Sequence, residues 1–351
     1  MKRSVTDKLR YRSIALAVIL ALIGCLGITS LSAAEKAAPT ELNIAIPCLT
    51  AVEQPWITSL IQALERVKAE KPHGLTINWN ISENILPPDA DRVLKQYAKS
   101  GEYGIILDHG TYPDVVKKLS QEYPDILWAF TGSGHKPLGG NGYWLDVYLH
   151  EPAYLCGIIA GMMSENNAIG AVASFPYPNV NLPINGFVSG AQSVSPDVKV
   201  KMTYLDSWWD PPKGKQSALA QIASGADFVY AERFGPFEAC KEKGKLAFGH
   251  FVDQYSLAPE VVIASPIARW DPALNTIIDA WWDHETKGTP YNAPMERIVF
   301  FMKDGGSELS SYHGNADKIP QKVKDAVSKA KADIMSGKLT VPFKEGQVLA
   351  N

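Results

Sequence analysis

The sequence predicts an α/β fold in which parallel sheets form two lobes, and three observations predict it. Short apolar runs alternate with amphipathic helical patterns, which is typical of βαβ units. This alternation occurs once in each half of the chain. In both halves a helix ends at a glycine, Gly101 or Gly225, just before a short apolar strand.

The first half is expected to alternate strands and helices in a simple order. Ile57, Leu60, Ile61 and Leu64 recur at helical spacing and predict one apolar helix face. The expected elements are strand 42–46, helix 56–69, strand 75–81, helix 90–99, strand 104–107, helix 115–123 and strand 126–130.

The second half is expected to repeat this plan after an apolar helix. The expected elements are helix 153–163, strand 169–173, helix 184–194, strand 198–205, helix 214–224, strand 228–231, helix 237–243 and strand 246–249. Two such halves predict two lobes, because each set of βαβ units can form its own parallel sheet.

Length and charge exclude several classes of protein. The 351 residues have a globular composition that is sufficient for two domains. The 34 Lys and Arg residues nearly balance 37 Asp and Glu residues, and no long block of like charge is present. The chain therefore lacks the electrostatic pattern of a nucleic-acid-binding protein.

The N-terminus has the pattern of an export signal. A basic segment, 1–12, precedes the uncharged segment 13–34, which ends in Ser32-Ala33-Ala34. Cleavage after Ala34 would give a periplasmic or otherwise extracytoplasmic protein. Two alternatives stay open: a membrane anchor, and cleavage at the lipobox-like Leu22-Ile23-Gly24-Cys25, which would tether the protein through lipidated Cys25.

The four cysteines predict neither a zinc site nor a redox pair, because the sequence has no C-x-x-C pair. Cys156 and Cys240 lie in helical patterns and are expected to be small buried side chains. We expect no metal and no cofactor.

A ligand-binding cleft is expected where the carboxyl ends of the strands in the two lobes face each other. The loops that leave these strands are 47–55, 108–112, 131–142, 174–185, 206–212, 232–236 and 250–254. They contain aromatic side chains and a few amides and carboxylates. This combination favours a flat aromatic ligand, which stacks on π-faces and offers polar edges.

Six short segments form one further pattern: Ala153-Tyr154-Leu155-Cys156-Gly157, Ile169-Gly170-Ala171-Val172-Ala173, Ile184-Asn185-Gly186-Phe187, Gly190-Ala191, Ser207-Trp208-Trp209-Asp210-Pro211 and Gly225-Ala226-Asp227. Together they resemble the basic membrane protein family of ABC-importer substrate-binding proteins. The resemblance spans about 41–340 and is strongest within 150–260.

This resemblance implies two Rossmann-like lobes and a hinge of three crossovers, the type I periplasmic-binding-protein architecture. The first lobe is expected to contain 41–147 and 258–290, and the second 148–257 and 291–310. A C-terminal helix and tail would occupy 311–351. The resemblance also implies purine bases or nucleosides as ligands, an ABC permease as membrane partner, and stacking of the base on the residue at Trp56.

Two departures from the family pattern favour a free base over a nucleoside. Phe251 and Ala268 stand where nucleoside binders of the family have an Asp and a Lys that suit sugar hydroxyls. A buried hydroxyl without a partner costs about 1–3 kcal/mol, so a ribose would need replacements for them. Trp208 lies in a Ser-Trp-aromatic-Asp-Pro signature that resembles binders of free purine bases.

Eight residues are the ligand-binding candidates, each with a packing role as its alternative. They are Trp56, Asp108, His109, Asn185, Trp208, Glu232, Phe234 and Asp253. Trp209 and Trp270 are expected to pack in the core, and Asp210 to cap a helix.

The expected protein is a monomer that binds a purine-like small molecule by hinge closure. Enzyme motifs such as Gly-x-Ser-x-Gly, His-Glu-x-x-His and the Walker loop are absent from the sequence. A sensor that presents its ligand to a membrane receptor and a nucleoside hydrolase are the alternatives. Base release from a nucleoside would favour the hydrolase.

Overall fold

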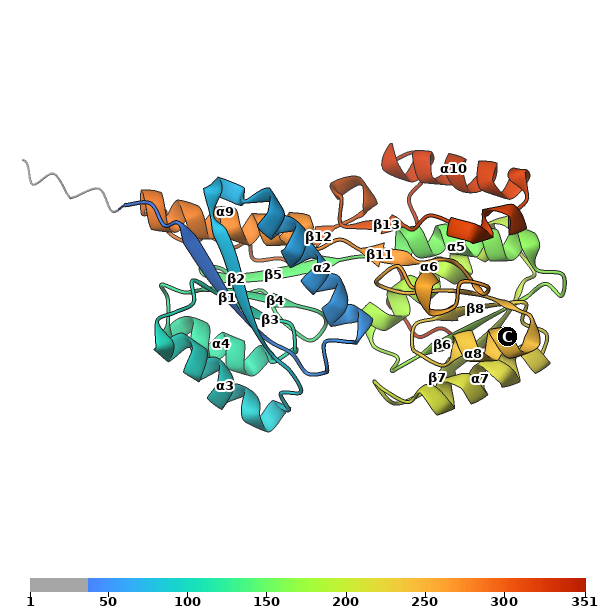
Figure 1. The fold of residues 1–351 in the computed structure, drawn as a ribbon, viewed down its shortest axis with the longest axis horizontal. Coiled ribbons are helices and arrows are strands. Elements are labelled where there is room, and N and C mark those ends of the chain that lie inside the picture. Colours follow the sequence, from blue (N-terminus) through green and yellow to red (C-terminus); the bar gives the residue numbers. More distant parts are fainter. Residues whose placement is uncertain (1–36) are drawn as a thin grey trace, which may run out of the picture. The chain divides into compact units, whose positions relative to one another are not determined.

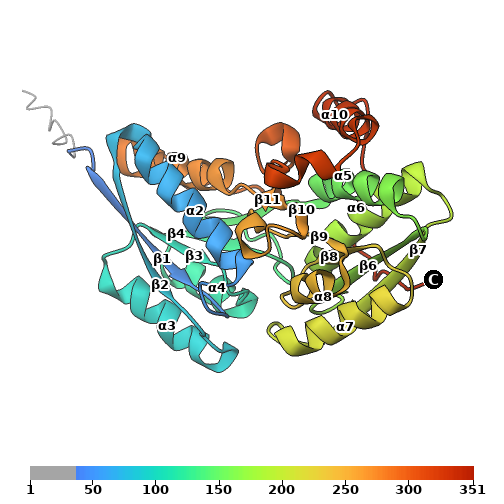
Figure 2. The same ribbon diagram turned by 45° about the vertical axis from the view of Figure 1, so that its right-hand side comes forward.

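The computed structural model describes residues 37–351. It contains two parallel β-sheets, each with helices on both faces, so the predicted fold class is confirmed (Figures 1 and 2). The expected cleavage after Ala34 and the lipobox at Cys25 lie outside the described residues.

The first lobe is built on a six-stranded parallel sheet in the order β12-β5-β4-β3-β1-β2. Its strands are β1 (Glu41–Pro47), β2 (Thr76–Ser82), β3 (Ile105–Asp108), β4 (Leu127–Thr131), β5 (Gly142–Val147) and β12 (Ile298–Phe300). Helices α2 (Pro55–Glu70) and α9 (Asp271–Lys287) cover one face, and α3 (Pro87–Ser100) and α4 (Pro113–Glu122) cover the other (Figure 1).

Helix α2 is fixed to this sheet by the face that its sequence predicts. Ile57, Leu60 and Leu64 are fully buried and pack with α9 in one core cluster. Burial of each such side chain contributes about 1.5–3 kcal/mol. Pro55 is at the first helical position, where no N–H is required. The packing therefore holds the start of α2, with Trp56, at the carboxyl edge of the sheet.

The second lobe is built on a five-stranded parallel sheet in the order β10-β9-β8-β6-β7. Its strands are β6 (Ala168–Ala173), β7 (Lys199–Tyr204), β8 (Phe228–Ala231), β9 (Leu246–Phe248) and β10 (Val262–Ala264). Helices α5 (His150–Met163), α6 (Pro178–Val194) and α10 (Gln321–Met335) contribute to one core cluster, and α7 (Pro211–Ala223) and α8 (Pro236–Lys243) to another.

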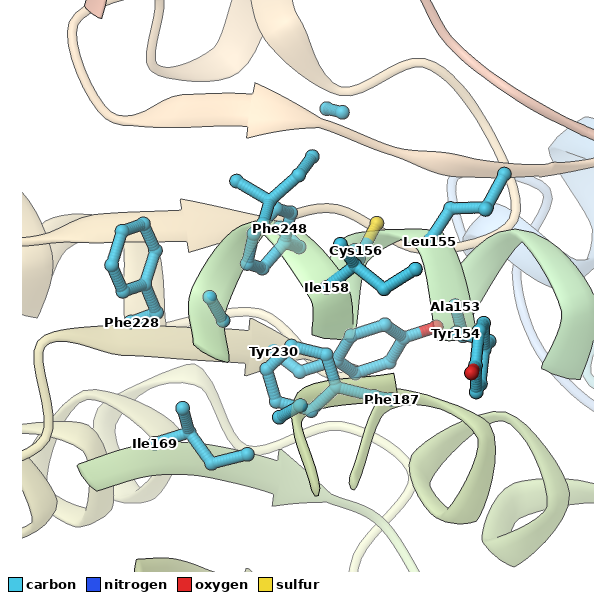
Figure 3. Packing of buried hydrophobic residues seen from close by; sticks show 14 of the residues in the cluster. Ala153, Tyr154, Leu155, Cys156, Ile158, Ile169, Phe187, Phe228, Tyr230 and Phe248 are labelled. Atoms are coloured by element: carbon cyan, nitrogen blue, oxygen red, sulfur yellow. The ribbon is translucent and has the colours of Figure 1, made fainter. Parts of the chain in front are cut away.

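Helices α5 and α6 pack closely because glycines face each other. A Cβ on Gly157 would come within 2.0 Å of the Phe187 carbonyl oxygen, and one on Gly190 within 2.0 Å of the Tyr154 carbonyl oxygen. Figure 3 shows Phe187 and Tyr230 in the core beneath α5. This packing fixes α6, whose first turn reaches the cleft.

Three crossovers join the lobes, at β5–α5, β10–α9 and β12–α10. β11 (Pro266–Ala268), in the second crossover, pairs antiparallel with β13 (Ser307–Leu309), in the third. Within 37–351, the remaining helices are short 3-10 turns: Pro72–Gly74, Tyr255–Leu257, Met302–Asp304 and His313–Lys318.

Strand pairing assigns two segments to lobes other than those expected. β10 pairs with β9, so the chain stays in the second lobe to Ala264 rather than leaving it at 257. β12 pairs with β5, so residues 298–300 belong to the first lobe rather than the second. Such long-range pairings cannot be recognised from local periodicity. The structure also contains elements that the sequence analysis did not predict individually: α9, β5 and β10 to β13.

The structure also tests the expected packing residues. Cys48, Cys156 and Cys240 are free and buried, and Trp270 is buried as expected. Asp210 caps α7 by accepting a hydrogen bond from the Lys213 amide at 3.0 Å. Trp209 does not pack in the core, because its side chain is 55% exposed at the edge of the second lobe.

Candidate functional site

A cavity between the lobes encloses about 630 Å³, including its opening to solvent. All the residues that line it lie in the seven loops at the strand ends, or directly after them at Trp56. They are Leu49, Thr50, Gln54, Trp56, His109, Gly110, Thr111, Gly132, Asn179, Val180, Trp208, Glu232, Arg233 and Phe251.

The first-lobe wall of the cavity is a stack of two rings. The rings of Trp56 and His109 are 4.3 Å apart and nearly parallel, at 6°. The edge of Trp270 meets both rings at right angles. Trp56 Nε1 donates to the His109 carbonyl oxygen at 3.2 Å. These contacts hold the Trp56 ring in one orientation without a ligand.

His109 is a neutral part of this wall. Its Nε2 donates to the Trp56 carbonyl oxygen at 3.2 Å, and its Nδ1 accepts from the Thr131 hydroxyl at 2.8 Å. Complete burial lowers the pKa of His109 to about 3, because the imidazolium would lose its hydration. The ring therefore stays uncharged around neutral pH and orients Trp56.

Asp108 lies behind the cavity wall rather than in it. Its carboxylate accepts hydrogen bonds from the backbone amides of Gly110, at 2.9 Å, and Tyr112, at 2.7 Å. Burial raises the pKa of Asp108 to about 7, against the effect of these hydrogen bonds. Thr111, between the two bonded amides, has a φ of 65°. Asp108 therefore shapes the loop that presents Thr111 to the cavity.

The second-lobe wall includes the face of Trp208. Phe175 and Tyr177 pack against this indole, with ring centroids 5.0 and 5.9 Å from it. The Arg233 guanidinium carbon lies 5.1 Å from the centre of the Trp208 ring. Such a contact is a cation–π interaction, which gains strength when water is excluded.

The buried pair of Glu232 and Arg233 is the most polar feature of the cavity. Arg233 Nη2 donates to Glu232 Oε1 at 3.0 Å, and the two side chains are only 9% and 1% exposed. Glu232 Oε2 accepts from the Ser174 amide at 2.8 Å. Burial raises the pKa of Glu232, although the guanidinium opposes the rise. Arg233 Nε is buried without a hydrogen-bond partner.

Hydrogen bonds connect the lobes across the cavity at Gln54 and at Ser133, whose hydroxyl also accepts from the Asn179 amide at 3.3 Å. Gln54 Nε2 donates to the Trp208 carbonyl oxygen at 3.4 Å. The Ser133 hydroxyl donates to Asn179 Oδ1 at 3.1 Å, which links the first lobe to the start of α6. The described arrangement is therefore one in which both lobes meet at the cavity rim.

The eight candidate residues separate into two groups. Trp56, His109, Trp208 and Glu232 line the cavity. The other four, Asp108, Asn185, Phe234 and Asp253, are not among its lining residues. Phe234 packs against Trp209, with ring centroids 5.2 Å apart.

Asn185 and Asp253 make structural contacts outside the cavity. Asn185 Nδ2 donates to the carbonyl oxygens of Lys344 and Gly346, at 3.0 and 2.8 Å, and so fastens the C-terminal tail. Asp253 Oδ2 pairs with His313 Nε2 at 2.6 Å, near the hinge. Their loops lie at the correct edge of the sheet, but these side chains point to other partners.

Arg233, Asn179, Gln54 and Phe251 line the cavity but are not among the eight candidates. Each lies in one of the loops already singled out, so topology is the signal that could have found them. Pro183, inside α6, has no N–H to donate to the Asn179 carbonyl four residues earlier. This one backbone hydrogen bond is therefore missing from the start of α6.

The described residues offer no sign of metal binding or of a membrane-spanning helix. Within 37–351, no three His, Cys, Asp or Glu side chains gather as metal ligands. No helix in the same range has both the length and the hydrophobicity needed to cross a bilayer.

Two parallel-sheet lobes, three crossovers and a cavity between the strand ends define the class of bilobal solute-binding proteins. A solved solute-binding protein of an ABC transporter from Aeropyrum pernix has the same fold, with a TM-score of 0.70 and 20% identity. The superposition covers 86% of this chain and 94% of that protein.

The chain belongs to the Bmp family, described as ABC transporter substrate-binding protein PnrA-like, whose model matches residues 50–331. This membership confirms the resemblance drawn from the sequence motifs.

Two curated relatives differ in the ligand that their names give. TsgA13 of Haloferax volcanii, named as a glucose-binding protein of an ABC transporter, is 30% identical over 269 residues. The match covers 74% of this chain but only 64% of TsgA13, so the chain spans less than two thirds of that relative. A purine-binding protein of Brucella abortus is 28% identical over 277 residues, which cover 77% of this chain and 74% of the relative.

Proposed function

We propose that the protein is the extracytoplasmic ligand-binding component of an ABC importer and carries a free purine base or a similar flat heterocycle. Membership of the Bmp family and the export-signal pattern support the first part. The relatives described above are named as binding proteins, and the proposed role requires binding without chemical change. Release of the molecule to a permease would complete its task.

The observation that carries the choice of ligand is the buried Glu232–Arg233 pair beside the face of Trp208. The Glu232 carboxylate can accept from a ring N–H or an exocyclic amine. Arg233 Nε is a buried donor that has no protein partner, and a ring nitrogen or carbonyl oxygen would satisfy it. Adjacent donors and acceptors along one edge of a flat ring are characteristic of purines.

The remaining polar groups suit a sugar less well. A sugar presents hydroxyls in several directions, and each needs a partner when it is buried. Both ring nitrogens of His109 are already engaged within the wall. Gln54 Nε2 is engaged with Trp208, and Asn179 Oδ1 with Ser133. The aromatic faces of Trp56, Trp208 and Phe251 favour a planar molecule instead.

Binding would work by hinge closure. Groups from both lobes line the cavity, so a ligand between them gains contacts only when the lobes are together. The Gln54–Trp208 and Ser133–Asn179 bonds would form in the same step. The closed monomer would then dock on the permease, held near the membrane by a lipid on Cys25 if the lipobox is used.

Mass spectrometry of small molecules released from the purified, denatured protein tests this proposal. A thermal-shift panel of adenine, guanine, hypoxanthine, xanthine, their nucleosides and glucose would follow. We expect at least one base to stabilise the protein, by about 2.7 kcal/mol at a concentration one hundred times its Kd.

Stabilisation by glucose and by none of the purines would contradict the proposed ligand. Conversion of a nucleoside to base and sugar during incubation would contradict the proposed role.

A further inference from the structure

Phe251 adopts a backbone conformation that is unusual for a bulky residue. It follows β9 with a φ of 64°, in the left-handed region. Its carbonyl oxygen accepts a hydrogen bond from the Ala268 amide of β11 at 2.8 Å, and it forms an isolated β-bridge with Ile267. Strain of this kind persists where the surrounding structure requires one placement, often at a ligand site.

The Phe251 ring reaches from the second-lobe chain into the first lobe. Its neighbours on β9 belong to the second sheet, but Phe251 itself belongs to the core cluster of the first lobe. The ring meets Trp56 edge-on, at 5.2 Å and 75°, and lies 4.1 Å from the His250 ring. The strained backbone therefore places this ring against the stacking surface of the cavity.

A second, rear cavity also has the Phe251 ring in its lining, and its empty volume is about 290 Å³ with the adjoining solvent included. Trp56, Asn179 and Phe251 line both cavities and so form the partition between them. Asp146 and Tyr148 also line the rear cavity. Asp146 is buried and lies 3.3 Å from Arg297 Nη1, so the rear cavity holds a carboxyl group whose oxygens could accept from a hydroxyl.

We propose that Phe251 is the residue that restricts the site to free bases, because its ring blocks the passage from the main cavity to the rear cavity. This inference rests on the proposed function. Of the three partition residues, Phe251 is the one that has a strained backbone and is hydrogen-bonded to β11, in the second crossover. A substituent on the ligand ring, such as the sugar of a nucleoside, would need the space that this ring fills.

The test compares F251A with the matched control F251L. Both replace Phe with a non-glycine residue at the same positive φ, but leucine keeps most of the apolar bulk. Calorimetry would measure the Kd of each base and its nucleoside: adenine and adenosine, hypoxanthine and inosine, guanine and guanosine. We expect the wild-type protein and F251L to prefer the base by about tenfold or more, as apolar pockets that exclude an added group do.

In F251A we expect this preference to fall by about tenfold, mainly through tighter nucleoside binding. In F251A/D146N we expect part of the gained nucleoside affinity to be lost. An unchanged preference in a folded F251A that still binds the base would overturn the inference and leave the proposed function intact. A wild-type protein that binds no purine would overturn both.

A measurement on the wild-type protein covers the case in which F251A does not fold. The base that binds would be compared with its 9-methyl and 9-ethyl derivatives, and we expect a stepwise loss of affinity as the substituent grows. A 9-ethyl derivative that binds as tightly as the base would overturn the inference.

Discussion

The two walls of the cavity differ in how complete they are. In the first-lobe wall, Trp56 and His109 are stacked, hydrogen-bonded to each other and uncharged. In the second-lobe wall, Glu232 and Arg233 are charged and buried, and Arg233 Nε has no hydrogen-bond partner. The ring nitrogens of the first-lobe wall all have hydrogen-bond partners within the protein, whereas the second-lobe wall contains a buried donor that has none.

This difference indicates a division of tasks. Burying charged groups is costly unless each is fully hydrogen-bonded, so an incompletely satisfied pair is poor evidence for a purely structural role. The first-lobe wall would provide a preformed surface for one face of the ligand. The second-lobe wall would read the polar edge of the ligand and distinguish it from others.

The largest effect is expected from E232Q. The substitution removes the charge that pairs with Arg233 and leaves the guanidinium buried beside a neutral amide. Loss of one partner of a buried charged pair at an interface typically costs about 2–5 kcal/mol in binding. Calorimetry with the base identified in the ligand panel would measure this loss.

E242Q is the control for this charge change, because Glu242 pairs with Lys215 on the surface and does not line the cavity. If E232Q binds the base within twofold of the wild-type Kd, the second wall does not read the ligand and the division of tasks is wrong.

The next effect is expected from W208A, with W209A as its neighbour control. Trp208 lines the cavity, whereas Trp209 does not line it and is 55% exposed. Loss of one stacked aromatic face should weaken binding by about 1–3 kcal/mol, by analogy with base–aromatic stacking. W209A should leave the Kd unchanged. Equal losses in the two variants would contradict the assignment of Trp208 to the cavity wall.

A smaller, pH-dependent effect is expected from H109Q. Folding holds His109 neutral, with its pKa lowered from 6.5 to about 3, whereas the unfolded chain takes up this proton below about pH 6.5. Protonation of His109 in the unfolded chain therefore lowers the free energy of unfolding as the pH falls from about 6.5 towards 3. H109Q should be less stable than the wild type at pH 7.5, because ring stacking is lost.

The deficit of H109Q in unfolding free energy should narrow at pH 4.5 by about 2–3 kcal/mol. Urea unfolding of both proteins at the two pH values would measure this change. A deficit that stays constant or grows in acid would mean that His109 is not held neutral in the first wall.

The smallest effect is expected from N185A, and it should fall on stability alone. The substitution removes the hydrogen bonds to Lys344 and Gly346 and should cost about 1 kcal/mol of unfolding free energy. Ligand affinity should not change, because Asn185 does not line the cavity. Weaker binding at unchanged stability would return Asn185 to the site.

Much of the fold was accessible from the sequence because its signals are local. The buried β6 and the amphipathic α2 have clear periodicities, and both are present as expected. The sequence places the start of helix α6 too late, at 184, because Pro183 suggests a helix boundary. In the structure the helix starts at Pro178 and Pro183 lies inside it. Three-residue strands such as β12 are too short for a periodic signal, and their lobe depends on pairing with distant strands.

The cavity was predictable as a set of loops but not as a set of side chains. The strand-end rule selects loops that contain every lining residue except Trp56, which directly follows one of them. It does not show that Asp253 turns to His313, or that Asn185 binds the tail. Nor does it show that Phe251 crosses into the first lobe, since this depends on a contact with β11.

The central claim is tested most directly by a crystal structure with the base that co-purifies or binds best. We predict density for a flat ring in the main cavity, with its polar edge within hydrogen-bonding distance of Glu232 and Arg233 and its face against an indole. Density for the base outside this cavity, or a bound ring whose edge avoids both residues, would contradict the account.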